Sequence, residues 1–111
     1  MLQVRTEYKK GVLFVRLKGR HDNASYLKKI NWIIEEIGIK FVVLNITNLT
    51  DISLKSIKKI IDYRKKLKKE KRLLIICDNN PLRNIVLKSS TRQIKKEIDA
   101  FTLINRKDVY E

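Results

Sequence analysis

Side chains that could do chemistry gather in residues 48–57, which read NLTDISLKSI. Asp51, Ser53 and Ser56 lie here between an apolar run and the start of a basic helical pattern. An oxygen at such a position can cap the helix, because it accepts a hydrogen bond from a backbone N–H that has no partner in the first turn. A phosphate would also be stabilised there by the helix dipole. Ser53 and Ser56 are therefore candidates for a helix cap and for the phosphoacceptor of a switch.

The remaining reactive side chains are isolated in the sequence. His21 is the only histidine and Cys77 the only cysteine, and they lie far apart. A metal cluster or catalytic triad needs several such groups together. We expect His21 in a loop or on the surface, and Cys77 as a buried thiol at the end of the apolar run LLIIC. No glycine-rich phosphate loop is present. The sequence thus predicts no catalytic residue, no metal, no cofactor and no enzyme activity.

The charge is strongly positive. The 111 residues include 26 lysines and arginines against 12 acidic residues, for a net charge of +14. One predicted helix carries much of it on its outer face, at Lys55, Lys58, Lys59, Lys65, Lys66 and Lys69. Three interpretations stay open: a solvated face that reflects an AT-rich genome, a docking surface for an acidic protein, and a nucleic-acid site. The scarcity of arginine and aromatic residues on this face disfavours the nucleic-acid site.

A tryptophan falls on the polar side of another predicted helix. Leu27, Ile30, Ile34 and Ile37 form an apolar stripe at helical spacing, and Trp32 points away from that stripe. Tryptophan is enriched at binding hot spots, which favours an interface role. The alternative is that Trp32 covers a helix end or a loop.

The elements alternate between strand and helix. Hydrophobic periodicity predicts strands at 3–9, 11–17, 40–46, 72–77 and 100–104. Helices are expected at 25–37, from the 48–56 loop to about 69, and at 81–89, while residues 91–98 are a second helical piece or a loop. The order β-β-α-β-α-β-α-β indicates a single α/β domain over residues 1–111, with a mixed four- to five-stranded sheet. We find no secretory signal and no membrane span, so we expect a cytoplasmic protein.

Several stretches resemble a STAS domain. GVLFVRLKGRHD is similar to the family's opening strand pair, with Gly19 and Asp22 at its glycine and aspartate positions. VVLNITNLTDISLKSIKKII is similar to its central strand, loop and second helix, LLIICDNNPLRNIVL to its next strand and third helix, and AFTLIN to its last strand. The resemblance covers nearly the whole chain and implies a STAS-like fold.

The loop departs from the family pattern of an apolar residue followed by aspartate, serine, serine, glycine and leucine. Without gaps, Lys55 takes the place of the phosphorylated serine; the other aligned residues are Ile52, Ser53, Leu54, Ser56 and Ile57. A shift of two residues would put Ser53 on the phosphorylated serine and Asp51 on the aspartate, but it would break the match of apolar positions. We prefer the ungapped alignment, in which the switch is absent or has moved to Ser53 or Ser56.

The resemblance implies a function. Small bacterial STAS proteins act as anti-sigma factor antagonists: they bind an anti-sigma factor that is also a serine kinase, and phosphorylation in the loop ends the interaction. We therefore expect a non-enzymatic regulator of transcription, with a partner surface that includes Asp22, Asn23, Trp32, Asp51, Lys55, Lys58 and Lys59. A STAS scaffold or transporter-associated module without a phosphorylation cycle and a basic nucleic-acid-binding module are the alternatives. The partner's identity and the oligomeric state stay open.

Overall fold

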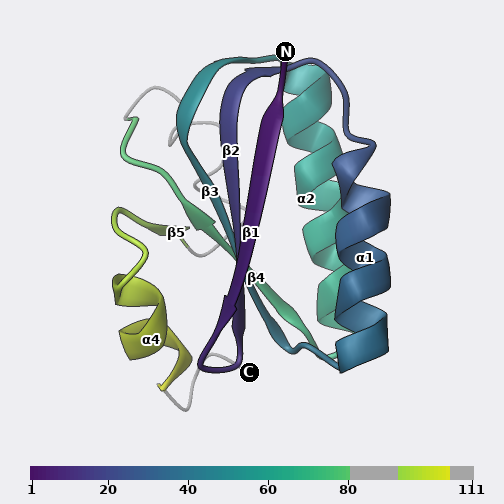
Figure 1. Ribbon diagram of the computed structural model, residues 1–111, viewed down its shortest axis with the longest axis vertical. Helices are drawn as coiled ribbons and strands as arrows, with labels where there is room; N and C mark the ends of the chain where they lie inside the picture. The colour runs from purple at the N-terminus through teal and green to yellow at the C-terminus, as the bar shows by residue number, and fades with distance from the viewer. Residues whose placement is uncertain (81–92, 106–111) are drawn as a thin grey trace.

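The computed structural model describes residues 1–80 and 93–105, which form a sheet between two helical layers (Figure 1). The elements along the chain are β1 Gln3–Lys9, β2 Val12–His21, α1 Tyr26–Ile37, β3 Phe41–Ile52, α2 Leu54–Lys69, β4 Leu73–Cys77, β5 Gln93–Ile94 and α4 Asp99–Ile104. The five strands lie in the order β1-β2-β3-β4-β5. β1 and β2 are antiparallel, and every other pair is parallel. The predicted mixed α/β sheet is confirmed.

The inner strands are buried on both faces of the sheet. Val12 to Val15 and Val42 to Leu44 are all buried, because helices cover both sides of a sheet whose strands run largely parallel. α1 and α2 lie against one face and α4 against the other (Figure 1). On the first face, alternate residues of β2 such as Leu13 and Leu17 meet Ile34 and Ile60 of the two helices.

The pairing of β2 with β3 brings the ends of both strands together. The register begins at Val12 opposite Phe41 and finishes at His21 opposite Ile52. It shifts twice on the way, and at each shift β3 contributes one extra residue.

Our prediction of strands ending at residues 17 and 46 was therefore too short. Residues 48–52 continue β3, and the expected 48–56 loop shrinks to Ser53. The two bulges interrupt the alternation of buried and exposed residues that would have revealed the longer strand.

The C-terminal elements differ from our prediction. Residues 100–104, expected to be the last strand, belong to α4. The fifth strand is Gln93–Ile94, within the stretch expected to be a helix or a loop. α4 forms because Ala100 and Phe101 pack on the sheet from a helical backbone, with the Phe101 ring 5.8 Å from that of Phe14. The predicted helix at 81–89 lies outside the described residues.

Gly19 of β2 lies against the backbone of Met1, just before β1 begins. Its φ of +97° is in the left-handed region, and a Cβ atom there would lie 2.5 Å from the carbonyl oxygen of Met1. Gly11, in the β1–β2 turn, has a φ of +81° but nothing within 4 Å of the same position. Both glycines therefore adopt a positive φ that disfavours other residues, but only at Gly19 would a side chain also collide with a neighbouring backbone atom.

We expect Gly11→Ala to lower the free energy of unfolding by about 1 kcal/mol, the cost of a left-handed backbone for an L residue. Gly19→Ala should cost roughly 3 kcal/mol, because the Met1 backbone must also move. Urea denaturation of both variants measures the difference. Equal losses would contradict the close approach of Met1.

Candidate functional site

The candidate site lies at the carboxyl ends of β2 and β3. His21 ends β2 opposite Ile52, the last residue of β3, and Ser53 follows at once. After His21 the chain passes through the turn at residues 22–25 into α1. Both helices on this face therefore begin at the same edge of the sheet. In parallel sheets this edge is the usual place for a binding site.

Two serine hydroxyls link the start of α2 to the end of β2. Ser53 is the N-cap residue of α2, with φ −80° and ψ 160°, and its Oγ accepts the backbone N–H of Ser56 at 3.1 Å. The Ser53 hydroxyl donates to Ser56 Oγ at 3.2 Å, and the Ser56 hydroxyl donates to the His21 carbonyl at 3.3 Å. Ser56 is half-buried in this chain of bonds, whereas Ser53 is exposed. Ser53 is therefore the more accessible hydroxyl of the two.

The neighbouring turn has its own hydrogen bonds. Asn23 Oδ1 accepts the backbone N–H of Ser25 at 3.1 Å and the Ser25 hydroxyl at 2.7 Å, which fixes the chain as it enters α1. Asp22 and Asn23 are both exposed. Asp51 forms an exposed ion pair with Arg20, 3.4 Å between Oδ2 and Nε, across the ends of the two strands. The structure thus brings Asp22, Asn23 and Asp51 to the same edge as the two serines.

His21 is buried, and our expectation of a surface or loop histidine was wrong. Its side chain is 3% exposed, and Nε2 lies 2.7 Å from the Tyr26 hydroxyl oxygen. Burial lowers the pKa of His21 below its ordinary value, and the positive charge of Lys59 lowers it further. The same burial raises the pKa of the Tyr26 hydroxyl above its ordinary value. The burial of His21 could have been predicted from the spacing of Leu13, Val15 and Leu17. Every second residue of β2 faces the core, and this spacing reaches His21 once the strand is extended to residue 21.

The outer face of the first two turns of α2 is exposed and basic. Lys55, Lys58 and Lys59 are all exposed, and no acidic residue lies in the first turn of the helix. Lysines continue to the other end of α2, at Lys65, Lys66, Lys68 and Lys69. This surface would attract an anionic group in solution.

Trp32 stands on α1, apart from the strand-end residues. Its side chain is 64% exposed, as expected from its place opposite the apolar stripe. It lies roughly 9 Å along the helix axis from Tyr26, given the helical rise per residue. The adjacent Asn31 accepts hydrogen bonds from Tyr63 at 3.1 Å and from Lys66 at 3.0 Å, which joins α1 to α2. Trp32 therefore adds an exposed ring to the outer surface of the helical layer.

A polar network on the opposite face of the sheet had no signal in our sequence analysis. Arg16 on β2 donates from Nε and Nη2 to Glu97 at 2.8 to 3.2 Å and from Nη2 to Glu7 on β1 at 2.9 Å. Asn45 on β3 donates to Glu97 at 2.7 Å. The Arg16 hydrogen bonds hold the pKa of Glu97 below its ordinary value. The network ties three strands to the segment after β5, which is a structural role.

Other kinds of site find little support in the described part of the chain. Residues 1–80 and 93–105 contain no group of three or more His, Cys, Asp or Glu side chains placed to hold a metal ion. Cys77 is buried as predicted, and burial raises the pKa of its thiol to about 11. None of the helices in the described ranges is long and apolar enough to cross a membrane.

No protein-family model matches the sequence, and no curated protein matches it. Solved structures do match the fold. An anti-sigma factor antagonist from Mycobacterium paratuberculosis is 16% identical, with a TM-score of 0.78 over 96% of both chains. The anti-sigma factor antagonist SpoIIAA, in its unphosphorylated form, is 15% identical, with a TM-score of 0.74 over 94% of this chain and 97% of that one. An uncharacterized protein with a SpoIIAA-like fold from Shewanella loihica is 14% identical, with a TM-score of 0.58 over 91% of each chain. The chain therefore has the STAS-like fold that its sequence led us to expect.

We expect the burial of neutral His21 to make stability depend on pH. In the unfolded chain the imidazole takes up a proton near its ordinary pKa of about 6.5. In the folded chain its pKa is lowered, so stability is fully present above that pH and falls as the pH drops below it. Wild type should therefore lose more free energy of unfolding between pH 7.5 and 5 than His21→Gln, which does not titrate. Urea denaturation at both pH values tests this, and equal losses would contradict a buried, neutral His21.

Proposed function

We propose that this chain is a regulatory protein-binding domain that docks an acidic partner protein, as an anti-sigma factor antagonist or a diverged relative of one. We call its binding surface the strand-end face, and it comprises Asp22, Asn23, Asp51, Ser53, Lys55, Lys58 and Lys59. The observation that carries the proposal is the exposed hydroxyl of Ser53 at the N-terminus of a basic helix. It lies at the switch-loop position suggested by the STAS resemblance, in a fold shared with two anti-sigma factor antagonists.

Charge favours an acidic protein as the partner. Lys55, Lys58 and Lys59 present three exposed ammonium groups within five residues of α2. Such a surface speeds encounter with an acidic patch and selects against basic partners. Trp32, exposed farther along the neighbouring helix α1, would supply a separate apolar anchor for a partner large enough to reach it.

Ser53 is the proposed switch residue. In the ungapped alignment Lys55 takes the position of the family's phosphorylated serine, so the switch would have moved to Ser53 or Ser56. Ser56 is already engaged with the His21 carbonyl. A phosphate on Ser53 would be stabilised by the N-terminus of α2. It would also place nearly two negative charges beside Lys55, which would repel an acidic partner.

Two substitutions at Ser53 separate the cap from the switch. We expect Ser53→Ala to lower the free energy of unfolding by about 1 kcal/mol, because the cap is lost, and to weaken partner binding far less than Ser53→Asp does, because alanine adds no charge. Ser53→Asp should keep the cap, since aspartate is an equally good N-cap residue, and weaken partner binding. Urea denaturation and capture of the partner from an extract of the source cell measure the two effects. Equal capture by both variants would contradict a switch at Ser53.

Charge reversal tests the docking surface. We expect Lys58→Glu/Lys59→Glu to weaken partner capture at least several-fold at low salt, because both ammonium groups lie on the strand-end face. The matched control is Lys95→Glu/Lys96→Glu, which makes the same change in net charge at two exposed residues between β5 and α4. The control should bind as wild type does. Equal loss in both variants would show that net charge, and not this surface, recruits the partner.

A further inference from the structure

The outer edge of β1 is unpaired within the described part of the chain. β1 is the first strand of the sheet and pairs with β2 on one side only. Figure 1 shows β1 at the front of the molecule, and all seven of its residues are exposed. A free edge presents backbone N–H and C=O groups to any strand that can pair with it.

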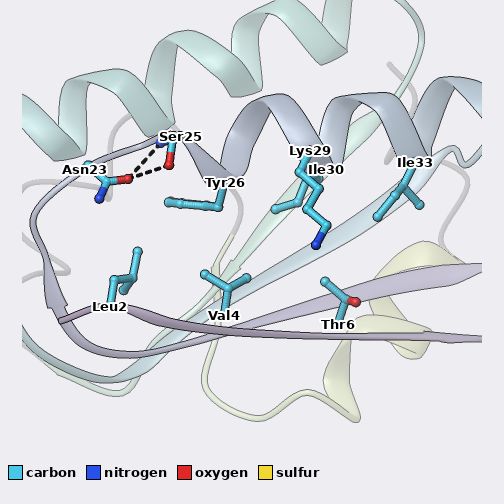
Figure 2. Close-up of a pocket in the computed structure, with 9 residues that line it drawn as sticks. All are labelled: Leu2, Val4, Thr6, Asn23, Ser25, Tyr26, Lys29, Ile30 and Ile33. Carbon is cyan, nitrogen blue, oxygen red and sulfur yellow. Dashed lines mark hydrogen bonds between the residues drawn. The ribbon is translucent and has the colours of Figure 1, made fainter.

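A groove lined by apolar residues together with Thr6, Asn23, Ser25 and Lys29 runs beside this edge on the helical side. Leu2, Val4 and Thr6 face Tyr26, Ile30 and Ile33 of α1 across a cavity of about 360 Å³ (Figure 2). Val4 is 38% exposed, and Tyr8, two residues beyond Thr6 on the same side of the strand, is 51% exposed. The free edge thus exposes two apolar side chains on this face, Val4 and Tyr8, on either side of Thr6.

The other face of β1 carries two opposite charges. Arg5 lies directly opposite Arg16 of β2, and Glu7 forms an ion pair with Arg16 at 2.9 Å. Arg5 makes no ion pair with another described residue, because the Arg16 opposite it is already paired with Glu7 and Glu97. A carboxylate on the outer side of the edge would give Arg5 a partner.

We propose that two copies of this chain pair through β1, antiparallel, about a two-fold axis at Thr6. In this register Arg5 of each copy faces the partner's Glu7, and Val4 faces the partner's Tyr8, whose ring covers the mouth of the groove. Gln3 faces the partner's Lys9. Opposite charges and apolar residues directly across two strands stabilise their pairing. The same surface serves both copies, as a closed two-fold interface requires.

The sequence of β1 selects this register over its neighbours. A shift by two residues in one direction places Arg5 opposite Arg5 at the axis, and in the other direction Glu7 opposite Glu7. Like charges directly opposite are destabilising. A shift by one residue would place apolar side chains of one copy against charged side chains of the other. The pairing centred on Thr6 has no like charges opposite each other between Gln3 and Lys9.

Charge also opposes association, because each copy carries +14. At an ionic strength of about 0.15 M the Debye length is about 8 Å, so charges remote from the β1 edge are largely screened while adjacent pairs still interact. The strand is only seven residues long, so we expect a weak dimer that forms as concentration rises. The inference does not rest on the proposed function, because it concerns a different edge of the sheet and needs no other protein.

The test is sedimentation equilibrium of the purified chain at about 0.15 M salt over a wide range of concentration. Wild type should form dimers. With Arg5→Glu alone, a glutamate at residue 5 faces Glu7 of the other copy on both sides of the axis. With Glu7→Arg alone, an arginine at residue 7 faces Arg5 of the other copy in the same two places. Each should weaken dimerisation at least roughly tenfold, because two attractive pairs become repulsive. Lys65→Glu on α2, which changes the net charge as Arg5→Glu does, should dimerise as wild type does.

Mixing the two single variants gives the decisive comparison. In an Arg5→Glu chain paired with a Glu7→Arg chain, the charges at residues 5 and 7 again meet their opposites across the interface, so the mixture should form heterodimers near wild-type strength. The double variant Arg5→Glu/Glu7→Arg should regain self-association for the same reason. Far-UV circular dichroism that matches wild type shows that each variant is folded. A monomeric wild type, single variants that dimerise normally, or a mixture of folded variants that does not associate would each overturn the proposal.

Discussion

The parallel pairing of β2 with β3 is the constraint on which the rest of the structure depends. It places buried residues of both strands at the centre of the sheet, between α1 and α2 on one face and α4 on the other. Two bulges absorb the extra residues of β3, so that His21 and Ile52 end side by side. Because β2 and β3 end at the same end of the sheet, α1 and α2 both begin there. The residues of the strand-end face are brought together only because the two strands end side by side.

Hydrogen bonds then couple the elements that meet at this edge. The Ser53 and Ser56 hydroxyls join the first turn of α2 to the carbonyl of His21, whose ring bonds Tyr26 in the first turn of α1. A change at Ser53 therefore acts on the start of α2 and, through Ser56, on the end of β2. On the other face, the bonds of Arg16 to Glu7 and Glu97 fix β1 and the segment after β5 to the sheet. The strand ends that carry the proposed switch are thus joined by hydrogen bonds to both α1 and α2, while the outer edge of β1 stays available for pairing.

Periodicity was enough to predict the elements whose burial pattern is regular. The apolar stripes of α1 and α2 and the continuous apolar run of β4 gave nearly correct bounds. The prediction failed where irregular backbone decides the structure. The bulges of β3 interrupt the alternation of buried and exposed residues, so its last residues were not predicted as strand. β5 pairs with β4 through backbone hydrogen bonds over only two residues, which is too short for a hydrophobic pattern to appear in the sequence. The apolar residues of α4 suit a strand as well as a short helix, and packing on Phe14 settles the choice.

The site was predicted in part for the same reason. Cap preferences indicated Ser53 or Asp51 as the cap of α2. Ser53 is the cap, whereas Asp51 lies in β3 and pairs with Arg20. The burial of His21 required knowing that β2 continues past Gly19, and the network around Arg16 joins residues 81 positions apart. The charge pattern of β1 is readable in the sequence, but its meaning depends on the strand lying at the edge of the sheet.

Cross-linking mass spectrometry of the complex captured on the tagged chain, from a nuclease-treated extract of the source cell, shows whether the strand-end face docks an acidic protein. We expect an acidic protein to stay bound after nuclease treatment and its cross-links to fall on Lys55, Lys58 and Lys59. Capture that disappears with nuclease would make the lysines of α2 a nucleic-acid surface. Cross-links confined to lysines elsewhere, such as Lys95 and Lys96, would contradict the strand-end face as the docking surface.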